Sequence, residues 1–148
     1  SYIGFWHDPV KNTYNKNEFN TNNDTIATNF LLNYEDLNLR VMSATTSQYL
    51  VFEKAITFEK LGNNALGKYI KDRWESYERW WTKNDLKKKR WIIWDLAIIE
   101  ALVHPEWTKI KSFKTPLENR SREIQIYTAI DTLKIQKNFW KHYKTLIN

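Results

Sequence analysis

The chain has 148 residues, the length of one domain, and 42% of them are hydrophobic, which is ample for a buried core. It has no cysteine, which excludes disulfides and thiolate metal sites. Charged residues such as Asp95 and Glu100 interrupt its apolar runs. These runs are far shorter than the roughly 20 residues that span a bilayer, so no transmembrane helix is predicted. The formal charge of +6 leaves polyanion binding open.

The sequence opens at Ser1 without Met and without a basic-then-apolar leader. This start indicates a processed product or a fragment. The compartment stays open, either cytoplasmic or, after processing, periplasmic or secreted.

The first 44 residues predict one crossover unit of a parallel sheet. The apolar run at 2–6 is typical of a buried strand, and Asp24 is expected to cap a helix that begins at residue 25. Residues 37–44 alternate between apolar and polar, which is strand periodicity. Strand, helix and strand in this order favour a right-handed crossover.

Helical periodicity then runs from Ser47 to Gly62, an expected C-cap, and a second helix is predicted from about 65 through 81. The apolar segment 91–103 is expected to be buried on all sides and to end before Pro105.

Two short strands are predicted near 108–114 and 123–128. Asp131 is expected to cap a closing amphipathic helix. The fold class is therefore α/β, with residues 1–148 forming a single unit.

Asp95 lies inside the apolar segment WIIWDLAIIEALV, where an unpaired buried carboxylate would be costly. It is expected to be protonated, paired or bound to a cation, or else to serve as the N-cap of the following helix. The two roles are compatible, because open α/β sheets bind ligands where strands end and helices begin.

The stretch NKNEFNTNND, residues 15–24, surrounds Glu18 with amides. Glu18 and Asn20 are two residues apart, so both side chains can point the same way from an extended chain. Carboxylate acceptors beside amide donors can bind both hydroxyls of a vicinal diol. An ordinary polar loop with Asx turns explains the same composition.

In order and spacing these segments resemble the inosine-uridine-preferring nucleoside hydrolases. NTYNKNEFNTNNDTIATNFLL is similar to the family's ribose-binding segment, and IIWDLAII to the later block in which an Asp completes a calcium site. EKLGNNALGKYI fits the helical connection between these blocks, and the segment from Glu100 to Asp131 is similar to the tail of bacterial members. The resemblance runs from about residue 12 onward.

The resemblance implies a Rossmann-like open sheet with flanking helices and hydrolysis of ribonucleosides to base and ribose, as in purine and pyrimidine salvage. It implies that Glu18 and Asn20 bind the ribose hydroxyls, with Asn12 near the 5′ side and Phe19 as an apolar neighbour. It makes Asp95 a ligand of a calcium ion, which prefers oxygen. It also implies a homo-oligomer of the complete unit.

The family's N-terminal cluster D-T-D-x-G-x-D-D is absent. The chain therefore resembles the C-terminal half of a nucleoside hydrolase. No catalytic residue is expected in it, because the general base and most metal ligands belong to the Asp-rich half, its expected partner. Alone it should be inactive.

Trp94 stands where many members carry a His that protonates the leaving base. An indole cannot shuttle a proton at neutral pH, although it can stack on a base. The nucleoside preference therefore stays open.

Two other hypotheses compete with this one. A noncatalytic, basic, Trp-rich module could bind nucleic acid or a protein partner through Lys87–Arg90. A degenerate family member could bind a sugar or nucleoside without cleaving it.

Overall fold

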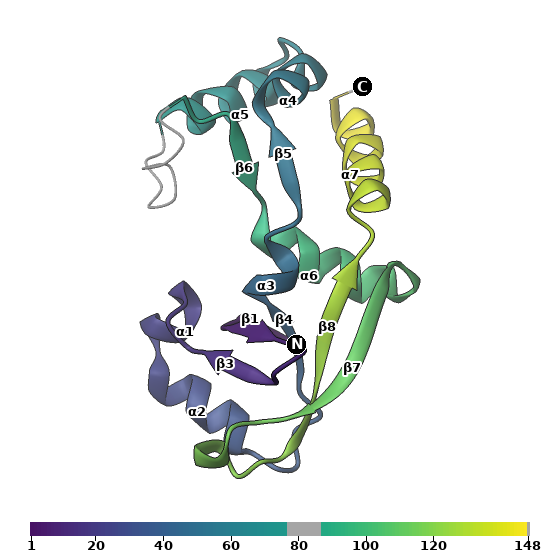
Figure 1. Cartoon of the computed structure of the whole chain (residues 1–148). Coiled ribbons are helices and arrows are strands. Elements are labelled where there is room, and N and C mark those ends of the chain that lie inside the picture. Colours follow the sequence, from purple (N-terminus) through teal and green to yellow (C-terminus); the bar gives the residue numbers. More distant parts are fainter. Residues whose placement is uncertain (77–86, 148) are drawn as a thin grey trace.

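An open four-stranded sheet, in the order β1-β4-β8-β7, organises one half of the molecule (Figure 1). The computed structural model describes residues 1–76 and 87–147. Strands β1 (Tyr2–Gly4), β4 (Arg40–Ser43) and β8 (Glu123–Ile130) are parallel, and β7 (Thr108–Lys114) runs antiparallel to β8 at one edge. With helices beside this mixed sheet, the fold is an open, Rossmann-like α/β fold, as predicted.

The predicted crossover is present. Helices α1 (Phe19–Asn23) and α2 (Thr25–Asn33) connect β1 to its parallel neighbour β4. Asp24 caps α2 by accepting a hydrogen bond from the Ala27 N–H at 2.7 Å. The strand predicted at 37–44 is shorter than expected and begins at Arg40.

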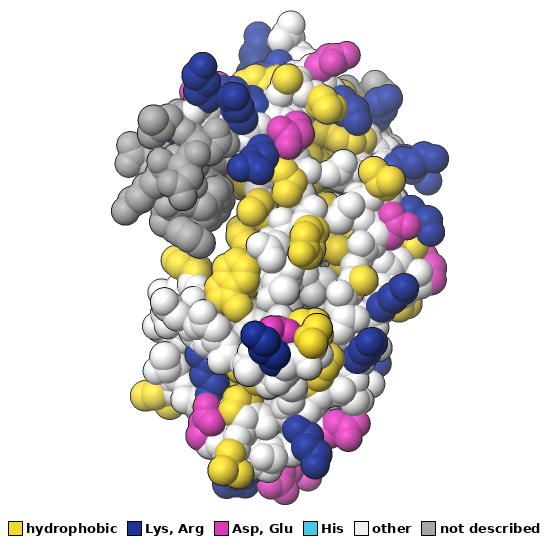
Figure 2. Space-filling view, viewed as in Figure 1, with side chains coloured by type: hydrophobic (Ala, Val, Ile, Leu, Met, Phe, Trp, Pro, Cys, Tyr) yellow, Lys and Arg dark blue, Asp and Glu magenta, His cyan; other side chains and the backbone are white. Residues whose placement is uncertain are grey.

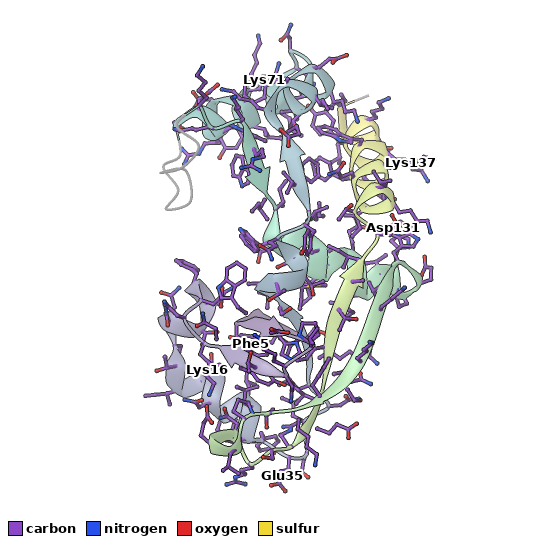
Figure 3. The ribbon with its side chains drawn as sticks, in the orientation of Figure 1. Phe5, Lys16, Glu35, Lys71, Asp131 and Lys137 are labelled. Atoms are coloured by element: carbon purple, nitrogen blue, oxygen red, sulfur yellow. The ribbon has the colours of Figure 1, made fainter. Side chains whose placement is uncertain are left out.

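The apolar run at 2–6 forms two strands instead of one. At Phe5 the backbone has φ 28°, and β2 (Trp6–Asp8) turns away to pair antiparallel with β3 (Thr13–Asn15). The Phe5 side chain is fully buried in the interior (Figure 3). The break follows from this burial and from the hairpin, neither of which local periodicity encodes.

The helix predicted from Ser47 is wrong in its first part. The chain forms α3 (Ala44–Ser47), then strand β5 (Val51–Glu53), and only then α4 (Lys54–Leu61). β5 pairs antiparallel with the distant β6 (Arg90–Ile92). Tertiary pairing therefore overrides the local helical period.

The remaining elements follow the prediction more closely. Gly62 ends α4 with φ +62°, and α5 (Ala65–Ser76) follows it. Residues 77–81 of the predicted helix, with Trp80 and Trp81, lie outside the described residues. The 3-10 turns η2 (Pro105–Trp107) and η3 (Leu117–Asn119) precede and follow β7. Asp131 caps α7 (Thr132–Ile147), since its Oδ1 accepts from the Lys134 N–H at 3.1 Å.

Helix α6 (Trp94–Val103) is less buried than its sequence predicted. It was expected to be buried on all sides, but Ile99, Leu102 and Val103 are each more than half exposed. The helix packs through its other face, where Ala97 and Ala101 are buried. No described helix is long and apolar enough to cross a membrane.

Two hydrophobic clusters form the core. The larger joins β5, α4, α5, α6 and α7, with Trp74 and Tyr127 among its largest fully buried side chains. The smaller lies between the sheet and the α1–α2 side and includes Phe5 and Leu32. Between these two parts the carboxyl ends of β1 and β4 meet α1, α3 and α6 (Figure 1).

Candidate ligand pocket

A pocket of about 910 Å³ lies at the carboxyl ends of the parallel strands β1 and β4. Ile3, on β1, and Ala44, directly after β4, form part of its wall. Its lining residues come from both halves of the chain: Ile3, Trp6, Asn17, Glu18, Phe19, Asn20, Asn22, Ala44, Ser47, Phe52, Thr57, Leu61, Ile70, Trp74, Trp91, Ile92, Ile93, Trp94, Asp95, Phe139 and Trp140. This is where open α/β sheets place ligands.

Glu18 and Asn20 both line this pocket, and Glu18 also caps helix α1. Its Oε1 accepts from the Asn20 N–H at 3.0 Å, and its Oε2 accepts from the N–H and the hydroxyl of Thr21 at 3.0 and 3.1 Å. A carboxylate offers about four acceptor sites, so these three bonds leave about one for a ligand.

A chain of hydroxyl groups holds Glu18 on the sheet. The single hydroxyl hydrogen of Thr21 goes to Glu18, so the Tyr2 hydroxyl donates to Thr21 at 2.9 Å and accepts from Thr28 at 3.2 Å. The Phe5 N–H also donates to the Thr21 oxygen, at 3.2 Å. Thr21 is 1% exposed, so the network is fixed within the fold.

The Asn-rich stretch is pinned to the protein as well. The Lys16 ammonium donates to Asn29 at 3.2 Å and to the buried Asn119 at 2.6 Å, and it pairs with Glu118 at 3.2 Å. The Asn119 amide in turn donates to Asn29 and Asn33 of α2. These contacts make the stretch an ordered part of the pocket wall instead of a loose loop.

Asn20 and Asp95 both contribute polar side chains to the pocket. Asp95 is the second residue of α6, after the N-cap Ile93, so it is not the N-cap itself. Its side chain is exposed, which corrects the expectation of a buried carboxylate. Within the described residues neither the Asn20 amide nor the Asp95 carboxylate has a side-chain partner, so both can bind a ligand.

Aromatic rings form the apolar wall. Trp94 lies edge-on to Trp6, with ring centroids 6.0 Å apart and planes at 90°. Deeper in the pocket, Trp74 and Trp91 make a similar pair at 5.0 Å. Phe19 is 65% exposed on the polar side. Aromatic side chains are the kind of surface against which a flat, apolar ligand ring packs.

The structure does not bring Asn12 to this pocket. Its amide oxygen lies 3.0 Å from His7 Nε2, and its amide nitrogen donates to the Lys114 carbonyl at 3.1 Å. His7 also lies outside the lining, against Tyr14 and Phe113. Burial lowers the pKa of His7 below 6.5.

Among the lining residues that escaped the sequence-based prediction are Asn17, Asn22, Trp6 and Trp91. The two asparagines contact each other, since the Asn22 amide donates to the Asn17 amide oxygen at 2.8 Å. Trp6 could have been found, because it comes two residues after a buried strand, where ligand sites gather. Trp91 could not, because its position depends on the pairing of β5 with β6.

The described lining contains two carboxylates, Glu18 and Asp95, and no lysine, arginine or histidine. In a chain with a charge of +6, this local acidity favours neutral or cationic ligands and disfavours phosphates. Calcium takes six to eight oxygen ligands, and no group of three His, Cys, Asp or Glu side chains occurs in the described part. The described residues alone therefore do not fit a complete calcium site.

The basic run Lys87–Arg90 is partly structural. The Lys88 carbonyl accepts the Trp74 indole N–H at 2.6 Å, and the Lys89 carbonyl accepts the Lys54 N–H at 2.7 Å. The Lys88 ammonium donates to the Glu75 carbonyl. These bonds give the segment a role in joining α4, α5 and β6.

Comparison with known proteins adds no relative: no family model matches the chain, and no curated protein matches it significantly.

Proposed function

We propose that the chain forms the nucleoside-binding part of a nucleoside N-ribohydrolase, which cleaves the N-glycosidic bond of ribonucleosides to base and ribose. One observation carries the proposal. Glu18, Phe19 and Asn20 line the same pocket as Trp94 and Asp95, although the two groups are far apart in the chain. These are the two blocks on which the sequence resemblance rests.

The polar groups suit the ribose. A vicinal diol presents two hydroxyls, each of which donates one hydrogen bond and accepts others. The Asp95 carboxylate and the remaining acceptor site of Glu18 accept from the diol, and the Asn20 amide can both donate and accept. The hydroxyl network behind Glu18 holds its carboxylate in place before the ligand arrives.

The aromatic wall suits the base. Trp94 and Trp6 line the pocket together with the proposed ribose contacts, and a purine or pyrimidine packs well against aromatic side chains. The described lining has carboxylates and no basic side chain, which supports a nucleoside as the proposed ligand over a nucleotide.

Hydrolysis requires a second polypeptide segment. We propose that an Asp-rich half provides the general base and most calcium ligands, and that Asp95 provides one ligand from this chain. The complete unit would act in nucleoside salvage as a homo-oligomer. The acidic lining would stabilise the cationic character that a ribosyl group gains as its bond to the base breaks.

Calorimetry with inosine tests the binding step. We expect Asp95→Asn to raise the Kd by about tenfold or more, since a hydrogen bond to a charged group is worth about 1.5–3 kcal/mol. Asn20→Ala should raise it by about fivefold or more, since its neutral amide can both donate and accept, at about 0.5–1.5 kcal/mol per bond. The matched control is Asn12→Ala, the same change in a residue outside the pocket, which should leave the Kd within about threefold.

The ligands themselves provide a second comparison. 2′-Deoxyinosine lacks a ribose hydroxyl, and inosine monophosphate adds charge, so both should bind more weakly than inosine. Equal affinities for all three, or an Asn12→Ala defect as large as that of Asn20→Ala, would contradict the proposal.

Reassembly tests the catalytic step. We expect a polypeptide with an Asp-rich N-terminal motif to copurify with this chain, and the pair to release ribose from nucleosides in a calcium-dependent way. Asp95→Ala should abolish the release while the pair still assembles. If the pair binds inosine but never hydrolyses it, the result would favour the alternative that the chain belongs to a degenerate protein that binds nucleosides without cleaving them.

A further inference from the structure

Helix α7 carries a stripe of lysines that the nucleoside pocket does not use. Residues 132–147 contain four lysines, Lys134, Lys137, Lys141 and Lys144, and no aspartate or glutamate. All four are exposed. At about 100° per residue they fall within about 80° of the helix circumference, and they extend over about 15 Å of its axis.

The opposite face of α7 holds the stripe rigidly. Ile135, Trp140 and Tyr143 are buried in the larger core cluster, and the Tyr143 hydroxyl donates to the Leu61 carbonyl at 2.8 Å. The apolar face is therefore not available for insertion into a lipid surface. Figure 3 shows Lys137 pointing away from the body of the protein.

Further positive charge borders the stripe. Lys60 of α4 is exposed, with its ammonium 5.3 Å from the Trp140 ring centroid, and β7 adds the exposed Lys109 and Lys111. Figure 2 shows Lys and Arg side chains along the α7 and β7 margin, with Asp and Glu side chains between some of them. Asp131 pairs with Lys134 at 3.3 Å, but this pair is solvent-exposed and easily exchanged.

We propose that this stripe binds the phosphate backbone of a nucleic-acid duplex without sequence preference. A row of charges on a straight, convex helix matches a linear polyanion, whereas a lipid surface is a plane. The stripe has no aromatic side chain on which the bases of a single strand could stack, because the aromatic rings of α7 face the core. This site is separate from the pocket and does not depend on the nucleoside proposal.

Fluorescence anisotropy with a labelled 20-base-pair duplex of mixed sequence tests the proposal in increasing salt. Changing Lys134, Lys137, Lys141 and Lys144 together to Gln should weaken binding at least tenfold. Each neutralised phosphate makes the plot of log K against log salt steeper by about 0.9, so the slope of the Gln variant should be shallower than that of the wild type by about 3 to 4. The same four positions changed to Arg should retain binding.

The matched control changes four exposed basic residues elsewhere, Lys11, Lys68, Arg73 and Arg120, to Gln. This control variant has the same net charge as the α7 Gln variant, and its affinity for the duplex should stay within about threefold of the wild-type value. Equal losses in both Gln variants would overturn the proposal, because net charge alone would then explain binding. Tighter binding to a 20-nucleotide single strand, or to vesicles containing phosphatidylserine, would overturn it as well.

Discussion

Replacing Thr21 by Val tests the network that holds the pocket's acidic wall. Valine has nearly the shape of threonine but lacks the hydroxyl, which accepts from Phe5 and Tyr2 and donates to Glu18. The change leaves the buried Phe5 N–H without an acceptor, at a cost of about 1–3 kcal/mol, and removes a hydrogen bond to a charged group, worth about 1.5–3 kcal/mol.

The new buried methyl group offsets about 0.8 kcal/mol, so a net loss of about 2–5 kcal/mol is expected. In a chain of this size 1 kcal/mol corresponds to about 2–4 °C, so the Tm should fall by about 4–20 °C. Urea denaturation gives the free energy directly from the midpoint and slope.

Thr21→Ser is the matched control, since it keeps the hydroxyl and loses only a methyl group. It should cost about 0.5–1.5 kcal/mol, less than the Val variant. If Thr21→Val unfolds at the wild-type midpoint, or if Thr21→Ser is the more damaging change, the network does not contribute as described.

Three further predictions concern the fold around the site. Gly67→Ala should destabilise the protein by about 1–3 kcal/mol in urea denaturation, because a Cβ there would lie 2.2 Å from the Leu61 carbonyl oxygen. Asn138→Leu should cost about 1–3 kcal/mol in the same assay, because its amide donates to both carboxylate oxygens of the buried Glu100, at 3.2 and 3.0 Å. Burial lowers the pKa of His7 below 6.5, so the free energy of unfolding should depend on pH. The protein should have its full stability above about pH 6.5 and lose stability as the pH falls, because the unfolded chain then binds more protons than the folded chain. Denaturation at pH 7.5 and at pH 5.0 measures this difference.

Each of these predictions has a control. Lys68→Ala, an exposed change beside Gly67, should be nearly neutral, and an equal effect would argue against the close approach. Adding Glu100→Leu to Asn138→Leu should recover most of the loss, because no carboxylate is then left without its donor. His7→Gln should flatten the dependence on pH between 6.5 and 5.0; an unchanged slope would assign it to other groups.

Several features could be predicted from sequence because their causes lie within a few residues. Asp24 and Asp131 cap helices since their carboxylates reach the N–H groups of the next turn. The strands β7 and β8 follow from alternation, and Gly62 ends α4 because its positive φ suits a residue without Cβ. The order of these elements was enough to predict an α/β fold.

Tertiary structure decided what depends on distant partners. The segment at 51–53 is a strand because it pairs with β6, far along the chain, against its local helical period. Asn12 and Asn20 are the same residue type in one polar stretch, but the β2–β3 hairpin takes Asn12 to His7 while α1 leaves Asn20 in the pocket.

Sequence by itself determined the caps, the alternating strands and the residue types that can bind a diol, because hydrogen bonding and periodicity act over a few positions. Only the tertiary structure decided which side chains share a pocket, that Asp95 is exposed, and that Trp6 lies across from Trp94. The physical reason is that these contacts join segments far apart in the chain, so their geometry exists only once the sheet and helices have packed.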